Sequence, residues 1–197
     1  MNEPWDEVVR LSKEGSEAMP DSGQFASTRE TQPLVEREAV LEAHKWLEKN
    51  KGFAELKSYT QPDPPDLVAT LIDGTTVDYE FAGIIHQKTM QAIKHRRNTL
   101  GIAGKYQDWT PVTFQKRICE LVSQKEQKFR DHLSNGIASQ PLILVLGSDG
   151  AMTHPSLIDE FSVSSSIFHV VLVHLGYIPN PNGSSDSEYM ILDITNQ

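Results

Sequence analysis

The chain has 197 residues, 38% of them hydrophobic, and a formal net charge of −9 at neutral pH. That size and content fit one globular domain, and the negative charge argues against nucleic-acid binding through overall charge. One cysteine, Cys119, excludes a disulfide framework or a cysteine-rich zinc site. The chain opens without a charged-then-apolar leader, and no apolar run approaches the roughly 18–20 residues of a membrane span. We therefore expect no membrane partner and a reducing, cytoplasmic location.

Residues 1–32 are polar and acidic and predict a flexible N-terminal arm in front of a single domain over residues 33–197. The domain opens with a predicted helix over residues 33–49. At 100° per residue its apolar side chains form one stripe, namely Val35, Ala39, Val40, Ala43, Trp46 and Leu47. Glu36 lies inside that stripe. Either the first helical turn stabilises it within reach of water, or it has a function; both interpretations stay open.

Residues 53–59 predict a strand, and the proline-rich residues 61–65 predict a stiff, non-helical connection. A β-hairpin follows over residues 66–82, with its turn at Asp73-Gly74. The alternating apolar residues are Leu67, Ala69 and Leu71 on one strand and Val77, Tyr79 and Phe81 on the other. Burying both sets on one face pairs Leu67 with Phe81 and Leu71 with Val77. That pairing requires a turn with an odd number of residues, or a bulge.

The same pairing places two acids on the opposite face of the hairpin, at its open end. Asp66 and Glu80 become diagonal neighbours about 7–8 Å apart or less, and Ala82 lies beside them. Two carboxylates this close suit a hard divalent cation, which prefers oxygen ligands. The hairpin therefore predicts a metal site that contains Asp66 and Glu80.

The segment that follows the hairpin is the one basic tract of an acidic protein. No acidic residue occurs from Phe81 to Gln107. The same stretch contains five cationic residues: Lys88, Lys94, Arg96, Arg97 and Lys105. This tract is either a nucleic-acid-binding surface that contacts phosphates next to the metal site or a solvated helix face.

Residues 111–135 predict a second long helix. Its apolar stripe consists of Phe114, Ile118, Leu121, Val122, Phe129 and Leu133, and Lys125 lies in the middle of it. A lysine in such a stripe either extends its ammonium to water or serves a site. The rest of the chain predicts a central strand buried on both faces at residues 141–146, a short helix near residues 155–161, and strands at residues 167–175 and 189–194.

The pair Pro65-Asp66 at the start of a strand, followed after a tight turn by Glu80 on the next strand, resembles the motif of the PD-(D/E)xK nuclease superfamily. The order of predicted elements over residues 33–146 is similar to the αβββαβ core of the restriction-endonuclease-like fold. The resemblance implies an α/β protein with a mixed sheet flanked by helices, to which the strands predicted at residues 167–175 and 189–194 add two C-terminal strands.

This resemblance also implies site residues and a cofactor. Asp66 and Glu80 would hold Mg²⁺ or Mn²⁺ with the main-chain carbonyl of Phe81, and Glu36 would bind a water ligand of the ion or a second ion. The motif lysine falls at Ala82 and is missing. In several families of this kind a lysine on the following helix takes its place, and Lys125 matches that position.

Two functions are therefore expected from the sequence. The first is a metal-dependent nuclease that hydrolyses phosphodiester bonds of DNA or RNA, with Asp66, Glu80, Lys125 and Glu36 as its catalytic residues. The second is a catalytically inactive module on the same fold, motivated by the missing strand lysine and the acidic composition, which binds a protein or a nucleic acid. A homodimer is compatible with either.

Overall fold

The computed structural model describes residues 32–62, 64–84, 109–134, 142–148, 155–177 and 189–196. The predicted arm, apart from residue 32, lies outside the described residues. So do all five cations of the predicted basic tract: Lys88, Lys94, Arg96, Arg97 and Lys105. Among the helices that the structure describes, none is long and apolar enough to cross a membrane.

The described strands form one mixed sheet of six strands in the order β1-β2-β3-β4-β5-β6. Their bounds are β1 Leu56–Thr60, β2 Leu67–Leu71, β3 Thr76–Ile84, β4 Leu142–Ser148, β5 Val170–Tyr177 and β6 Tyr189–Asp193. The central strands β3, β4 and β5 are parallel, and the outer strands β1, β2 and β6 pair antiparallel with their neighbours. The predicted α/β class, the mixed sheet and the two additional C-terminal strands are confirmed.

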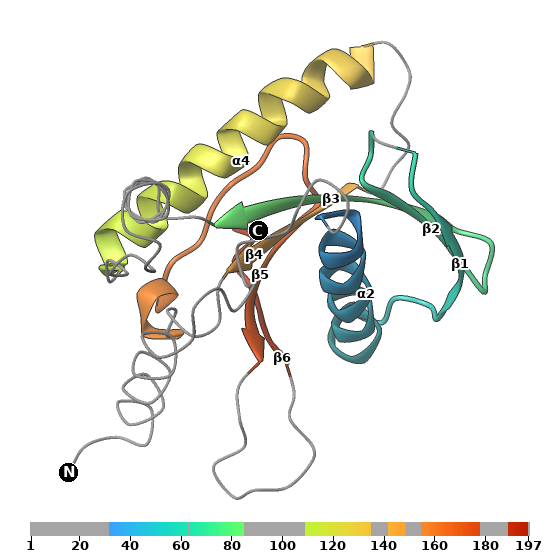
Figure 1. The fold of residues 1–197 in the computed structure, drawn as a ribbon, viewed down its shortest axis with the longest axis horizontal. Coiled ribbons are helices and arrows are strands. Elements are labelled where there is room, and N and C mark those ends of the chain that lie inside the picture. The colour runs from blue at the N-terminus through green and yellow to red at the C-terminus, as the bar shows by residue number, and fades with distance from the viewer. Residues whose placement is uncertain are drawn as a thin grey trace, which may run out of the picture.

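Two helices cover opposite faces of this sheet: α2 (Gln32–Lys51) lies on one side and α4 (Pro111–Ser134) on the other (Figure 1). Val40, Ala43 and Leu47 of α2 pack on one face, whereas Phe114 and Ile118 of α4 pack on the other. Strand β4 is buried between them, as its continuous apolar sequence predicts. A short 3₁₀ helix, η1 (Pro155–Ile158), packs beside α4.

The ends of the two helices follow from local sequence. At the start of α4, Thr110 and Thr113 satisfy each other's backbone N–H groups, with N–O distances of 3.0 and 3.3 Å, and Pro111 occupies the first turn. At the end of α2, Gly52 adopts a left-handed backbone conformation with φ 71°, as a C-terminal glycine commonly does. Lys49 and Lys51 lie in the last turn of α2, where the helix dipole favours positive charge.

The predicted hairpin is present, but its predicted pairing is wrong by two residues. Leu67 pairs with Tyr79 and Ala69 with Val77, instead of Leu67 with Phe81. The turn holds three residues, Ile72, Asp73 and Gly74, because the Leu71 N–H donates to the Thr75 carbonyl. An odd loop preserves the predicted faces, so both apolar sets still pack on the α2 side. Extending this pairing by one residue places Asp66 directly opposite Glu80 instead of diagonal to it.

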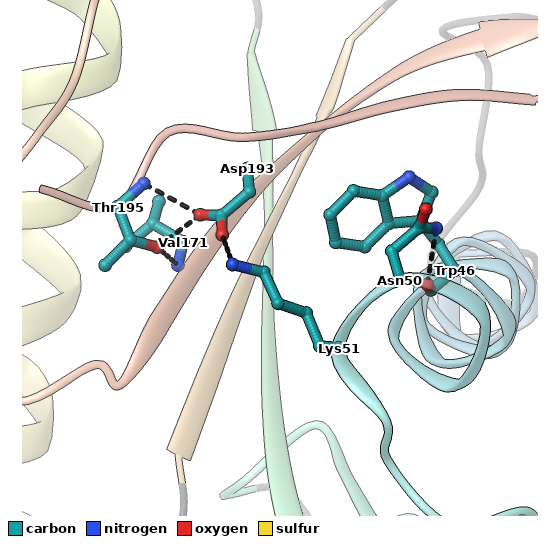
Figure 2. A network of polar contacts seen from close by, with 6 residues as sticks. All are labelled: Trp46, Asn50, Lys51, Val171, Asp193 and Thr195. Atoms are coloured by element: carbon teal, nitrogen blue, oxygen red, sulfur yellow. Dashed lines mark hydrogen bonds and ion pairs between the residues drawn. The ribbon is translucent and has the colours of Figure 1, made fainter. Parts of the chain in front are cut away.

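A polar network joins the end of α2 to the last strand (Figure 2). Lys51 Nζ lies 2.7 Å from Asp193 Oδ2, and the Thr195 hydroxyl donates to Asp193 Oδ1 over 2.6 Å. The Thr195 oxygen in turn accepts a hydrogen bond from the Val171 N–H. Burial raises the pKa of Asp193, but the hydrogen bonds from Lys51 and Thr195 outweigh burial and hold that pKa below its ordinary value. The ionised carboxylate therefore stabilises the folded state.

We predict that Asp193→Asn lowers the free energy of unfolding by about 1–2 kcal/mol at pH 7, since charged hydrogen bonds are lost. A depressed carboxyl pKa contributes stability above its ordinary pKa, and this contribution disappears as pH falls through the folded-state value. The difference between the wild type and the variant should therefore shrink below about pH 4. Urea unfolding at pH 7 and pH 3 measures it, with Asp159→Asn, an exposed acid, as the matched control. A difference that does not change with pH would contradict this account.

Candidate active site

Asp66 lies just before β2, where the chain enters the hairpin after the proline-rich connection. Its Oδ2 accepts a hydrogen bond from the Phe81 N–H over 2.7 Å, so the carboxylate is held against β3. The side chain is only 15% exposed. One loop residue is thereby fixed by the backbone of the strand that carries the second predicted acid.

Glu80 lies in the middle of β3, and its alternation with Tyr79 directs it toward the α4 face of the sheet. Its side chain is fully buried, at 0% exposure. Among the described residues, Glu80 Oε2 has no hydrogen-bond partner. A buried carboxylate oxygen without a donor is costly, and a cation beside it removes that cost.

Lys125 reaches this pair of acids from the middle of α4. Its Nζ donates a hydrogen bond to Glu80 Oε1 and lies 3.8 Å from Asp66 Oδ2. The lysine is 20% exposed, so its stem is covered while its ammonium faces the two carboxylates. Helix α4 thus supplies a cation to the buried face of β3, a strand that carries acidic residues but no lysine or arginine of its own.

Lys128, one helical turn further along α4, also faces Glu80. Its Nζ lies 3.5 Å from Glu80 Oε1, and its side chain is 47% exposed. The two lysines therefore differ in environment, since Lys125 is enclosed and contacts both acids, whereas Lys128 lies at the rim.

Opposing effects act on the pKa of Glu80. Burial is the largest effect and raises the pKa, and the nearby charge of Asp66 raises it further. Lys125 and Lys128 lower it, but the net result is a pKa above the ordinary value of a glutamate. The ammonium groups therefore compensate the buried charge only in part.

The donor set suits a divalent cation of the magnesium class. Two carboxylates contact the same ammonium, one of them has a buried, unpartnered oxygen, and hard cations prefer such ligands. The N–H and C=O of one residue in an extended strand point to the same side. Because the Phe81 N–H points at Asp66, its carbonyl lies on the same side of β3 and is the third candidate ligand.

Glu36 does not complete a group of three acids. It is half-buried near the start of α2, the helix that packs on the face opposite to Glu80. Across the parts of the chain that the structure describes, no three His, Cys, Asp or Glu side chains cluster as metal ligands. The predicted pair Asp66–Glu80 and Lys125 come together, whereas the role predicted for Glu36 stays a prediction.

Sequence reasoning missed two polar residues next to this site. Lys128 lies at the edge of the α4 stripe, where a lysine is expected on any surface helix. Asp78 is buried, at 2% exposure, two residues before Glu80 and on the same face of β3. The available signal was the spacing Asp-x-Glu, which places both acids on one face of a strand.

On the opposite face of β3, a buried histidine joins α2 to the sheet. His44 Nδ1 lies 2.6 Å from the Tyr79 hydroxyl, and Nε2 lies 3.2 Å from the Ala54 carbonyl and 3.1 Å from Glu48 Oε1. Burial lowers the pKa of His44, which favours the neutral ring. In that form Nε2–H donates to the Ala54 carbonyl and Glu48, and Nδ1 accepts from the Tyr79 hydroxyl. Both ring nitrogens of His44 are therefore hydrogen-bonded within the protein.

The same helix borders a cavity of about 650 Å³ between α2 and β1. Four of its lining residues are glutamates: Glu38, Glu42, Glu48 and Glu55. This negative lining repels phosphate groups, so an anionic polymer is expected at the α4 face and not here.

Comparison of the chain with protein-family models, with curated proteins and with solved structures finds no match. The resemblance to the PD-(D/E)xK superfamily therefore depends on the residues themselves.

Removal of the Lys125 ammonium tests how far it compensates Glu80. We predict that Lys125→Met lowers the free energy of unfolding by about 3 kcal/mol, because Glu80 is left buried with only the distal Lys128 beside it. Adding Glu80→Gln removes the charge that lost its partner, so the double variant should be more stable than the sum of the two single changes implies, by about 1 kcal/mol or more.

The measurement is chemical unfolding of the wild type, both single variants and the double variant. Lys116→Met is the matched control, since residue 116 is exposed and nine residues from Lys125, which places it on the opposite face of α4. Strictly additive effects would show that the two side chains do not interact.

Proposed function

We propose that this protein is a metal-dependent nuclease with a restriction-endonuclease-like fold, acting on phosphodiester bonds of DNA or RNA. One observation carries the proposal: an ammonium from α4 meets two carboxylates of the β2–β3 hairpin in a chain that lacks the strand lysine of the superfamily motif. The element order αβββαβ, followed by two further strands, supports it.

In this proposal Asp66 and Glu80, with the Phe81 carbonyl, hold one Mg²⁺ or Mn²⁺. When bound, such an ion lowers the pKa of a coordinated water and offsets charge on the phosphate. Asp66 is already oriented by the Phe81 N–H, and Glu80 is held by Lys125, so both acids are preorganised before substrate arrives.

Lys125 has two tasks in the hydrolysis. Its ammonium orients the attacking water through a donated hydrogen bond, and it stabilises the negative charge that grows on the phosphate oxygens. The water oxygen forms a bond to phosphorus as the ester P–O bond breaks. The attacking water releases one proton to solvent, and the leaving oxygen takes up one proton from solvent. A low-dielectric surrounding strengthens the effect of Lys125, since its partner Glu80 is fully buried.

Binding of a polyanion by a chain with a net charge of −9 requires local positive charge. Lys125 and Lys128 provide it beside the two acids. The basic residues Lys88, Lys94, Arg96, Arg97 and Lys105 follow β3 in sequence, and we propose that they contact the nucleic-acid backbone.

The test is cleavage of plasmid DNA, single-stranded DNA and single-stranded RNA with Mg²⁺ or Mn²⁺. We predict that Asp66→Asn and Glu80→Gln each reduce the rate by at least about 100-fold, because the cation loses a ligand, and that Lys125→Met has a similar effect through lost charge stabilisation. Lys116→Met should cleave at the wild-type rate. Far-UV circular dichroism establishes that each variant is folded.

Equal cleavage by the wild type and the three site variants would remove the nuclease proposal. The direct contact between Lys125 and Glu80 favours a second candidate, a catalytically inactive module on the same fold that binds a protein or a nucleic acid. In that case the ammonium compensates the buried carboxylate without any cation. Absence of cleavage by the wild type on all three substrates with both metals supports this second candidate.

A further inference from the structure

The formal charges of the four side chains in contact at the proposed metal site sum to zero before any cation binds. Asp66 and Glu80 carry two formal negative charges, and Lys125 and Lys128 carry two positive charges within 4 Å of them. A divalent cation between the carboxylates adds two positive charges and leaves the group with an excess of two. Such an excess favours either departure of an ammonium or arrival of an anion.

The two ammonium groups are not equivalent candidates for departure. Lys125 contacts both acids and is 20% exposed, whereas Lys128 contacts Glu80 alone, at 3.5 Å, and is 47% exposed. A half-exposed lysine regains water and side-chain freedom when it leaves its partner, so Lys128 gives up Glu80 at a lower cost than the enclosed Lys125 does. Lys128 is therefore the ammonium that a cation at Glu80 displaces most easily.

A displaced Lys128 remains at the rim of the same site. It is three residues from Lys125 on α4, so the two side chains are neighbours on one helix face. Its side chain is half-exposed, whereas the side chain of Glu80 is closed to solvent. An anionic substrate group that approaches the carboxylate pair from solvent thus meets Lys128 first.

We propose that Lys128 is a phosphate-binding residue that exchanges Glu80 for a non-bridging phosphate oxygen of the substrate when the cation binds. Metal and phosphodiester binding are then cooperative, since each offsets the charge that the other introduces. This inference rests on the proposed nuclease function and assigns a task to a residue that the sequence motif does not contain.

The experiment measures Mn²⁺ affinity by isothermal titration calorimetry, with and without a phosphorothioate thymidine oligonucleotide that resists hydrolysis. For the wild type we expect the oligonucleotide to tighten Mn²⁺ binding at least about fivefold. Lys128→Met should bind Mn²⁺ at least as tightly as the wild type without the oligonucleotide, because the competing ammonium is gone, and should lose the tightening. Lys128→Arg should retain it, and Lys116→Met, which loses the same charge elsewhere on α4, should behave as the wild type.

The outcomes separate this inference from the function on which it rests. Equal tightening in Lys128→Met and wild type, or no tightening in the wild type, overturns the role of Lys128 while Mn²⁺ binding at Asp66 and Glu80 stands. If the wild type does not bind Mn²⁺, or Asp66→Asn binds it equally well, the proposed metal site fails and the inference fails with it.

Discussion

A carboxylate enclosed in the middle of a sheet must have positive charge beside it. In this protein the carboxylate is that of Glu80, and the other side chains of the site are arranged around it. Its side chain is fully buried beneath α4, and one of its oxygens has no partner among the described residues. Lys125 supplies the charge from α4, and the packing of Phe114, Ile118 and Phe129 holds that helix on the sheet. The hydrophobic core and the polar site therefore both depend on where α4 lies on the sheet.

The two faces of the sheet differ in how far their polar groups are satisfied within the protein. On the α2 face, the polar groups of His44 and Tyr79 satisfy each other, and Lys51 and Asp193 join the helix to the last strand. These contacts use their donors and acceptors within the protein. On the α4 face, two acids and two lysines leave a carboxylate oxygen unpartnered within the described structure. This unpartnered oxygen belongs to Glu80, one of the acids of the proposed metal site.

Much of this arrangement could be predicted from the sequence because it depends on periodicity. Alternation along the hairpin gave the faces of Asp66 and Glu80, and the helical stripe gave Lys125. The exact pairing was not predictable, since shifting the hairpin by two residues keeps every side chain on its face. Only the three-residue turn, closed by the Leu71–Thr75 hydrogen bond, fixes it.

Other features depend on contacts between residues distant in sequence. Lys128 has the spacing of an ordinary surface lysine, and its closeness to Glu80 arises only when α4 packs across β3. His44 lies at the edge of the apolar stripe of α2, and its partner Tyr79 is 35 residues away in the sequence. The sequence shows that Glu36 lies among the apolar residues of α2. Periodicity within one helix does not show how far that residue lies from Asp66 and Glu80.

We propose that Asp66 and Glu80 form one cation site beside Lys125. Anomalous diffraction from crystals soaked in Mn²⁺ locates bound cations without reference to activity. We expect a strong anomalous peak between the carboxylates of Asp66 and Glu80, absent from crystals of Asp66→Asn. A peak only at other acids, such as the glutamates between α2 and β1, or no peak at a saturating Mn²⁺ concentration, would contradict it.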